Sequence, residues 1–160
     1  MPSSYNIFVD HTFLVACFCA SVNSDQHVAR QARATELLEE FFTRLPPPKF
    51  YTTSSEVSRA ITNVFRQTGP AETVKFIDKL TSSSRPRIRI KMVSWRVMNA
   101  ALEEFRQEAS PYYKIGCEFL DLTSFFFIMQ NRNRFEIREI VAFHDHFAQV
   151  QQIMKVTVYS

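Results

Sequence analysis

Length, composition and charge limit what this chain can be. At 160 residues, 46% of them hydrophobic, it has the size of one domain with a substantial core. Its formal charge of +3 is too small to indicate a nucleic-acid partner by itself. The chain has only two glycines, Gly69 and Gly116, so it contains neither a Walker loop nor a GxGxxG turn. Nucleotide chemistry of those two kinds is therefore excluded.

Cysteine usage and the first residues predict where the protein resides. Cys17, Cys19 and Cys117 form no CxxC pair and lie among apolar residues, so we interpret them as reduced core thiols rather than zinc ligands. The first residues lack the basic segment of a signal peptide, and the apolar run over residues 13–22 is too short to cross a bilayer. We expect a cytoplasmic protein without a membrane segment.

The first half of the chain alternates strand and helix patterns. Residues 5–10 form a short apolar run that ends in Asp10, which is typical of a buried parallel strand. Helical patterning follows over residues 12–21 and 28–44, and the prolines at 46–48 stop the second helix. The next expected elements are a strand over residues 49–52, helices over 54–67 and 71–80, and a loop over 82–86.

The second half continues this alternation. Residues 87–93 alternate charged with aliphatic side chains, which predicts a strand with one wet face. The later elements are expected to be helices over residues 95–110 and 118–133 and strands over 139–143 and 153–158. Together these patterns predict one three-layer α/β/α domain over residues 1–160, with a central parallel sheet of about five strands. Ligands bind such sheets at the carboxyl ends of the strands.

Four acids follow expected strands or begin expected helices: Asp10, Glu56, Asp121 and Asp145. In a parallel sheet they would converge on one edge, where clustered carboxylates require a cation such as Mg²⁺ or Mn²⁺. Such a cation can activate water for phosphodiester hydrolysis. Each acid also has a structural alternative. Glu56 fits a capping box with Thr53, Asp10 and Asp145 could be helix N-caps, and Asp121 could be a first-turn acid.

The order and flanks of these acids resemble the PIN-domain family. Val-Asp-His-Thr-Phe-Leu-Val-Ala (residues 9–16) is similar to the family's opening, and Tyr-Thr-Thr-Ser-Ser-Glu (51–56) is similar to its second segment. Phe-Leu-Asp-Leu-Thr-Ser-Phe (119–125) looks like its third, and Ala-Phe-His-Asp-His-Phe (142–147) resembles its closing Thr-Phe-Asp-x-x-Phe signature. The resemblance covers residues 5–158 and is greatest to VapC-type toxin ribonucleases of toxin–antitoxin systems.

This resemblance implies a metal-dependent endoribonuclease in which Asp10, Glu56 and Asp121 bind Mg²⁺ or Mn²⁺. The fourth position departs from the family pattern, because aligning the two phenylalanines puts His144 where the family has Asp, with Asp145 one place later. Either residue is a candidate for the fourth ligand, and a histidine suits Mn²⁺ better than Mg²⁺. The alternative function is a catalytically weak or inactive PIN-like scaffold that binds RNA or a protein.

Other catalytic chemistries have less support in the sequence. His11, His144 and His146 lie beside the acids and could act as acid–base groups or form a His-rich metal site. Because no serine or cysteine nucleophile motif accompanies them, we interpret them as solvated or packing histidines. A haloacid-dehalogenase phosphatase needs a second Asp two residues after the first, where Thr12 stands. The arrangement of a phosphoreceiver domain is likewise not found.

Basic and aromatic groups point to partners. One basic group contains Arg85, Arg87, Arg89 and Lys91, and the other contains Arg132, Arg134 and Arg138. Each could hold an RNA backbone, or form a solvated strand face or a helix C-terminus. Residues 125–127, three successive phenylalanines, point about 100° apart on a helix and cannot all face one core. We expect at least one to meet a second copy of the chain, an antitoxin protein, or both; the alternative is an aromatic wedge between internal layers.

Overall fold

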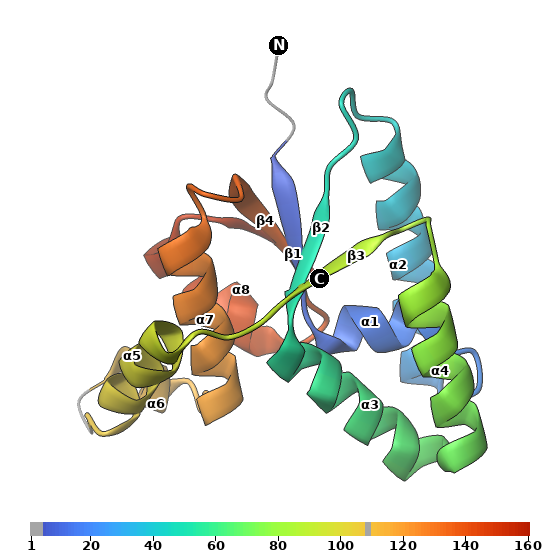
Figure 1. Cartoon of the computed structure of the whole chain (residues 1–160), viewed down its shortest axis with the longest axis horizontal. Coiled ribbons are helices and arrows are strands. Elements are labelled where there is room, and N and C mark those ends of the chain that lie inside the picture. Colours follow the sequence, from blue (N-terminus) through green and yellow to red (C-terminus); the bar gives the residue numbers. More distant parts are fainter. Residues whose placement is uncertain (1–4, 108–109) are drawn as a thin grey trace.

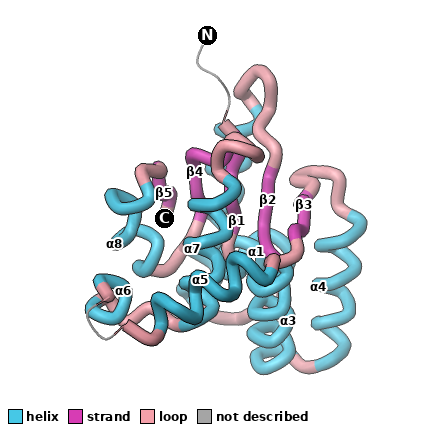
Figure 2. The backbone as a smooth tube through the Cα atoms, turned by 60° about the vertical axis from the view of Figure 1, so that its left-hand side comes forward, coloured by secondary structure: helices cyan, strands magenta, loops and turns pink. Residues whose placement is uncertain are grey.

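A sheet of five parallel strands forms the centre of the computed structural model, which describes residues 5–107 and 110–160. The strand order is β3-β2-β1-β4-β5, and Figure 2 shows this order across the sheet. The strands are β1 (Asn6–Val9), β2 (Phe50–Thr53), β3 (Ile88–Lys91), β4 (Ile137–Val141) and β5 (Thr157–Tyr159). The expected three-layer α/β fold with a parallel sheet is confirmed.

Helices cover both faces of the sheet. On one face lie α1 (His11–Phe18), α2 (Asp25–Phe42), α3 (Ser54–Thr68) and α4 (Pro70–Ser82). On the other lie α5 (Trp95–Phe105), α6 (Pro111–Lys114), α7 (Phe119–Asn131) and α8 (Asp145–Met154). Figure 1 shows α2 and α4 to the right of the sheet and α5 and α7 to its left. Among the described residues, no helix combines the length and apolar character that crossing a bilayer requires.

The central strand β1 explains why the early sequence is a continuous apolar run. Side chains alternate between the two faces of a strand, so Ile7 and Val9 enter the core beneath α1–α4, whereas Phe8 enters the core beneath α5–α8. All three are fully buried. A strand that is covered on both faces has no side exposed to solvent, so its sequence does not alternate between apolar and polar residues.

The largest error in the expected elements lies near the C-terminus. Residues 145–154 form α8, which was not expected, and β5 starts only at Thr157, so the strand expected over 153–158 is too long. Phe147, Val150 and Met154 recur at helical spacing and are buried. The signal is short, because α8 has only 10 residues, and the aliphatic residues around it favoured a strand. The helix expected over 95–110 ends at Phe105, and residues 108–109 lie outside the described chain.

The three successive phenylalanines of α7 pack inside the molecule. Phe125 contacts Phe147 edge to face with ring centroids 4.8 Å apart, and Phe127 lies 6.1 Å from Phe8. Phe126 is half-buried and contacts Tyr112 at 6.4 Å. The helix can bury Phe125 and Phe127 because it lies between the sheet and the neighbouring helices. These two rings form the aromatic wedge that was the alternative, and a partner contact at the half-buried Phe126 stays a prediction.

We expect Phe125→Ala to lower the free energy of unfolding by about 3–5 kcal/mol, because it opens a cavity where the ring is fully buried. Phe65→Ala is the matched control: Phe65 is 54% exposed, so its loss should cost less than about 1 kcal/mol. Urea unfolding followed by circular dichroism measures both changes. Equal losses in the two variants would contradict this account of the core.

Candidate metal centre and active site

The carboxyl ends of the strands bring the predicted acids to one edge of the sheet. Asp10 directly follows β1, and Glu56 lies in the first turn of α3, which begins where β2 ends. Asp121 lies in the first turn of α7. All three side chains are fully buried, which is unusual for carboxylates and requires compensating partners.

Asp10 is held from three directions. Its Oδ1 accepts hydrogen bonds from the backbone N–H of Phe13 (3.0 Å) and from Thr12 Oγ1 (2.6 Å), so it caps α1 as the structural alternative supposed. Thr12 Oγ1 in turn accepts from the backbone N–H of Phe143 (2.8 Å), which ties the segment after β4 to this turn. The second oxygen, Oδ2, lies 3.0 Å from His144 Nε2 and 3.7 Å from His11 Nδ1.

His144, and not Asp145, turns toward Asp10. His144 is the N-cap of α8, and its Nδ1 lies 3.3 Å from the backbone N–H of His146. Asp145 is the exposed first residue of α8, and no hydrogen bond or ion pair connects its side chain to another described residue of the centre. The chain leaves β4 at Val141, so the following residues no longer alternate as a strand, and the turn decides which side chain faces inward.

The contact between Asp10 and His144 changes the protonation of both groups. Burial raises the pKa of Asp10, but His144, His11 and Thr12 together outweigh burial and hold this pKa below its ordinary value. Burial lowers the pKa of His144, yet the Asp10 carboxylate outweighs burial and raises it above its ordinary value. Each group therefore stabilises the charged form of the other.

Glu56 connects three helices. Its Oε2 accepts from the backbone N–H of His11 (2.9 Å) and lies 2.8 Å from His11 Nδ1. Its Oε1 accepts from Ser124 Oγ of α7 (2.5 Å). Thr53 caps α3 by accepting from the backbone N–H of Glu56 (3.3 Å), which is only the Thr half of the capping box that was the alternative. The Glu56 side chain itself is directed to His11 and Ser124.

Asp121 has both oxygens engaged. Oδ1 accepts from Arg59 Nη1 (2.7 Å), and Oδ2 accepts from the backbone N–H of Glu118 (2.9 Å) and lies 2.7 Å from His146 Nδ1. Burial raises the pKa of Asp121, but the Arg59 hydrogen bond, that of the Glu118 backbone and the nearby charges lower it below its ordinary value. Asp121 is thus neutralised by a guanidinium in this structure.

Two groups of side chains have the composition of a metal site. One contains Asp10, His11 and His144, and the other contains Cys117, Asp121 and His146; within each group the potential ligand atoms lie within 4.8 Å of one another. Asp10 Oδ2 and His144 Nε2 are buried, face each other at 3.0 Å and have no hydrogen bond with good geometry to the described residues. Asp10 Oδ2 can bind a cation directly, and His144 Nε2 can do so once it has lost its proton. The first group therefore fits a divalent ion, whereas the oxygens of Asp121 are already used.

Cys117 remains a thiol beside this second group. Burial raises its pKa to about 12, and the charge of Asp121 acts in the same direction. Cys19 is buried and Cys17 is half-buried, and all three cysteines are free. Their environments agree with the interpretation as core thiols.

Sequence reasoning missed two contributors and misjudged two others. Arg59 and Ser124 were not singled out, although each lies three residues after a predicted acid, on the same helical face as Glu56 and Asp121 respectively. That spacing was the available signal. His11 and His146 were interpreted as solvated or packing groups, whereas they contact Glu56 and Asp121.

We expect Asp121→Asn to lower the free energy of unfolding by about 1.5–3 kcal/mol at pH 7, because it removes the charge that Arg59 faces. The pKa of Asp121 is lowered in the folded state, so its stabilising effect is complete above the ordinary value of 3.8 and is lost as the pH falls through the folded value. The difference in the free energy of unfolding between wild type and variant should therefore become smaller below about pH 4. Urea unfolding at pH 7, 5 and 3.5 measures this difference.

Asp145→Asn is the control, because Asp145 is exposed. It should change stability by less than about 0.5 kcal/mol at each pH. If the difference in unfolding free energy between wild type and Asp121→Asn stayed constant from pH 7 to pH 3.5, it would contradict the ion pair between Asp121 and Arg59.

Comparisons with known proteins match this arrangement at the level of the fold. Neither a protein-family model nor a curated protein sequence matches the chain. The crystal structure of VapC20 from Mycobacterium tuberculosis, a sarcin-ricin loop cleaving toxin, superposes with a TM-score of 0.66 at 22% identity, covering 91% of this chain and 95% of that chain. FitAcB from Neisseria gonorrhoeae superposes with a TM-score of 0.55 at 13% identity, covering 96% of each chain. The chain therefore has a VapC-like PIN fold.

Proposed function

We propose that this protein is a metal-dependent endoribonuclease, similar to VapC toxins, that hydrolyses RNA phosphodiester bonds with Mg²⁺ or Mn²⁺. One observation carries the proposal: two buried potential ligand atoms, Asp10 Oδ2 and His144 Nε2, lie 3.0 Å apart at the carboxyl edge of the sheet without a hydrogen bond of good geometry. The fold supports it, because one solved structure of this fold is a toxin that cleaves the sarcin-ricin loop.

Asp10 and His144 would hold the cation, with Glu56 and Asp121 as further acids of the centre and Asp145 outside it. A bound divalent cation lowers the pKa of water and neutralises charge that develops on a phosphodiester. Thr12 orients Asp10, while His11 and Ser124 fix the two oxygens of Glu56. These contacts hold the acids in place before a substrate arrives.

Two hollows border residues of the centre. One is lined by His11, Thr12 and Arg30 among others, and the second by Arg59 and Arg66 with Ser55, Ser58 and Glu118. Arginine side chains can grip phosphate through two parallel hydrogen bonds. Arg30 and Arg66 are the cations that would position the backbone at the centre, because Arg59 is already paired with Asp121.

The scaffold alternative has specific support in the same centre. Arg59 already neutralises Asp121, and His144 stands where the family has a carboxylate. To offer the Nε2 lone pair to a cation, neutral His144 must carry its proton on Nδ1, which then cannot accept from the backbone of α8. Both features weaken cation binding, so a protein that binds RNA or a protein partner with little cleavage is the second candidate.

The remaining expectations concern the organisation of the protein. We propose that residues 1–160 act as one domain in the cytoplasm, as a homodimer and with an antitoxin protein as partner. The single domain rests on the length of the chain and the cytoplasmic location on its unpaired cysteines, whereas the homodimer and the antitoxin rest on the resemblance to VapC-type toxins. Phe125 and Phe127 are buried and take no part in such a surface.

We expect Asp10→Asn to reduce metal-dependent RNA cleavage at least about a hundredfold, because it removes the charge from the carboxylate available to the cation. Asp78→Asn, at an exposed position of α4, removes the same charge elsewhere and should keep the wild-type rate. Cleavage of a labelled RNA at saturating Mn²⁺ measures both. Wild-type cleavage by Asp10→Asn would reject the proposed centre.

His144→Asp and Asp145→Asn test the departure from the family pattern. The first restores an all-oxygen ligand set, so we expect Mg²⁺-supported cleavage to rise relative to Mn²⁺-supported cleavage. The second should change little, because Asp145 is exposed and His144 faces Asp10. Cleavage in each metal, with metal binding measured by calorimetry, separates the two residues. If wild type and both variants neither bind metal nor cut RNA, the scaffold function replaces the enzyme.

A further inference from the structure

Positively charged side chains lie along the edge strand β3. Only β2 pairs with β3 in the sheet, so the other side of this strand is open. Arg87 and Arg89 are exposed and Lys91 is half-buried. Arg89 and Lys91 are two residues apart in the strand and point to the same face at a spacing of about 6.6 Å, and Arg87 directly precedes the strand. We call Arg87, Arg89 and Lys91 the β3 basic row.

Aromatic rings lie beneath this row. Arg89 and Lys91 lie over the ring of Tyr51, with their charged groups 6.0 and 5.9 Å from its centroid, and Lys91 is 5.1 Å from the centroid of Phe135. Tyr51 and Phe135 stack with centroids 5.1 Å apart. Arg134 approaches Phe135 at 5.3 Å. The stacked rings hold the cations at the surface, where the side chains lose little further freedom on binding an anion.

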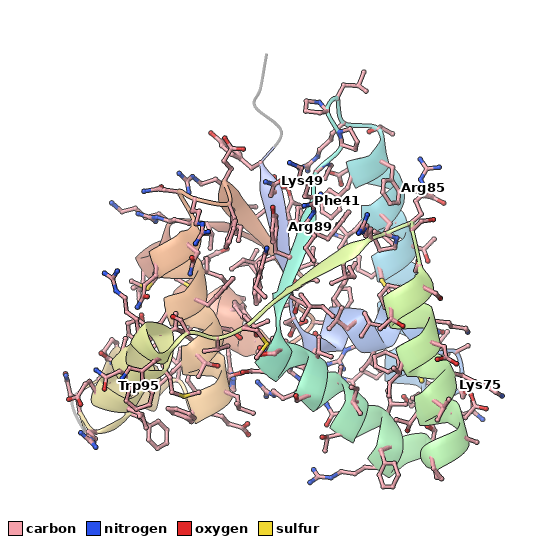
Figure 3. The ribbon with its side chains drawn as sticks, in the orientation of Figure 1. Phe41, Lys49, Lys75, Arg85, Arg89 and Trp95 are labelled. Carbon is pink, nitrogen blue, oxygen red and sulfur yellow. The ribbon has the colours of Figure 1, made fainter. Side chains whose placement is uncertain are left out.

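The row borders two hollows whose linings contain cations and no carboxylate among the described residues. Arg44, Lys49, Arg85, Arg87 and Arg89 contribute to the hollow at the start of β3, and Lys91, Arg96 and Arg134 contribute to the one at its end. In Figure 3, Lys49, Arg85 and Arg89 are labelled around the first of them.

The row itself has no acidic partner. Within the described part of the chain, no ion pair joins Arg87, Arg89 or Lys91 to a carboxylate, whereas Arg44 and Arg59 are both paired. Unpaired like charges on neighbouring residues repel one another, and a polyanion laid along them would relieve that repulsion. Charge complementarity therefore indicates a polyanionic ligand.

An exposed aromatic side chain follows the row in the chain. Trp95, the single tryptophan of the protein, is 73% exposed and is the first residue of α5. It lies four residues after Lys91, which limits the distance between their Cα atoms to about 14 Å. Figure 3 labels it at α5. A large exposed ring close to a basic groove is suited to stacking against a nucleobase.

We propose that the β3 basic row binds the backbone of a single-stranded RNA segment and that Trp95 stacks on one of its bases. This rests on the proposed function only in naming RNA as the ligand. Lys91 is in register with Thr53, the N-cap of the helix that carries Glu56, so the row ends at the carboxyl edge of the sheet, as the candidate centre does. The row would thus hold RNA outside the centre.

The alternative role of these charges is to prevent edge-to-edge pairing of β3 with another chain. That role requires polar side chains at the edge, but it requires neither a neighbouring tryptophan nor affinity for RNA. A measurement of RNA binding therefore distinguishes the two roles.

The test uses the full chain and an unstructured, fluorescein-labelled RNA of about 12 nucleotides in EDTA, so that binding is measured without metal-dependent cleavage. Arg89→Gln/Lys91→Gln should weaken binding at least about tenfold and reduce the slope of log affinity against log salt by about 1.4. Lys75→Gln/Lys79→Gln removes the same two charges from exposed positions of α4 and should change affinity less than about twofold. Thermal unfolding verifies that each variant is folded.

Tryptophan fluorescence gives an independent readout. RNA binding should quench Trp95, and Trp95→Ala should weaken binding about tenfold. Undiminished affinity in Arg89→Gln/Lys91→Gln, an equal loss in the α4 variant, or unquenched Trp95 at saturating RNA would overturn the inference. If the protein cuts RNA but gives one of these three results, the inference about the β3 basic row is rejected and the proposed function stands. If it binds RNA as described but never cuts it, the proposed function is rejected and the inference about the β3 basic row stands.

Discussion

The burial of three carboxylates at one end of the sheet is the constraint that organises this molecule. Asp10, Glu56 and Asp121 each have 0% exposure. An ionised carboxylate in a low-dielectric interior is costly unless charges and hydrogen bonds compensate for the lost water. The structure provides these partners from other elements, so every acid joins its own helix start to another part of the chain.

Those compensating contacts hold the carboxyl edge together. His11 joins the start of α1 to Glu56 on α3, and Ser124 joins α7 to the same carboxylate. Arg59 connects α3 to Asp121, and Thr12 connects the β1–α1 turn to the segment after β4. The centre therefore contains its own positive charges. A cation that enters must compete with imidazole and guanidinium groups for the carboxylate oxygens.

The basic side chains divide into two populations that the net charge conceals. Arg44 and Arg59 lie in ion pairs within the fold, where they balance specific acids. Arg89 and Lys91 of β3 lie on aromatic rings without a described acidic partner and give the edge strand an uncompensated positive field. A formal charge of +3 for the whole chain averages over both groups. Where a charge lies decides whether it stabilises the fold or is available to a ligand.

The linear chain contained the signals that depend on local periodicity and on the direction of parallel strands. These signals predicted the alternating strands and helices, the parallel sheet, and the acids at Asp10, Glu56 and Asp121 on its carboxyl edge, because strand ends and helix starts are local features. They failed for α8, where ten residues with three buried apolar positions carry too short a helical pattern beside aliphatic residues that favour a strand.

Tertiary structure alone decided which neighbours the acids have. Whether His144 or Asp145 faces Asp10 depends on where β4 ends and α8 begins, and a shift of one residue would exchange the two side chains. The pairing of Asp121 with Arg59 joins residues 62 positions apart. Phe125 and Phe127 can both be buried because α7 lies between the sheet and other helices, which no helical projection of a single segment can indicate. Such contacts depend on how elements that are far apart in the sequence pack against one another, and the local sequence around each residue does not specify that packing.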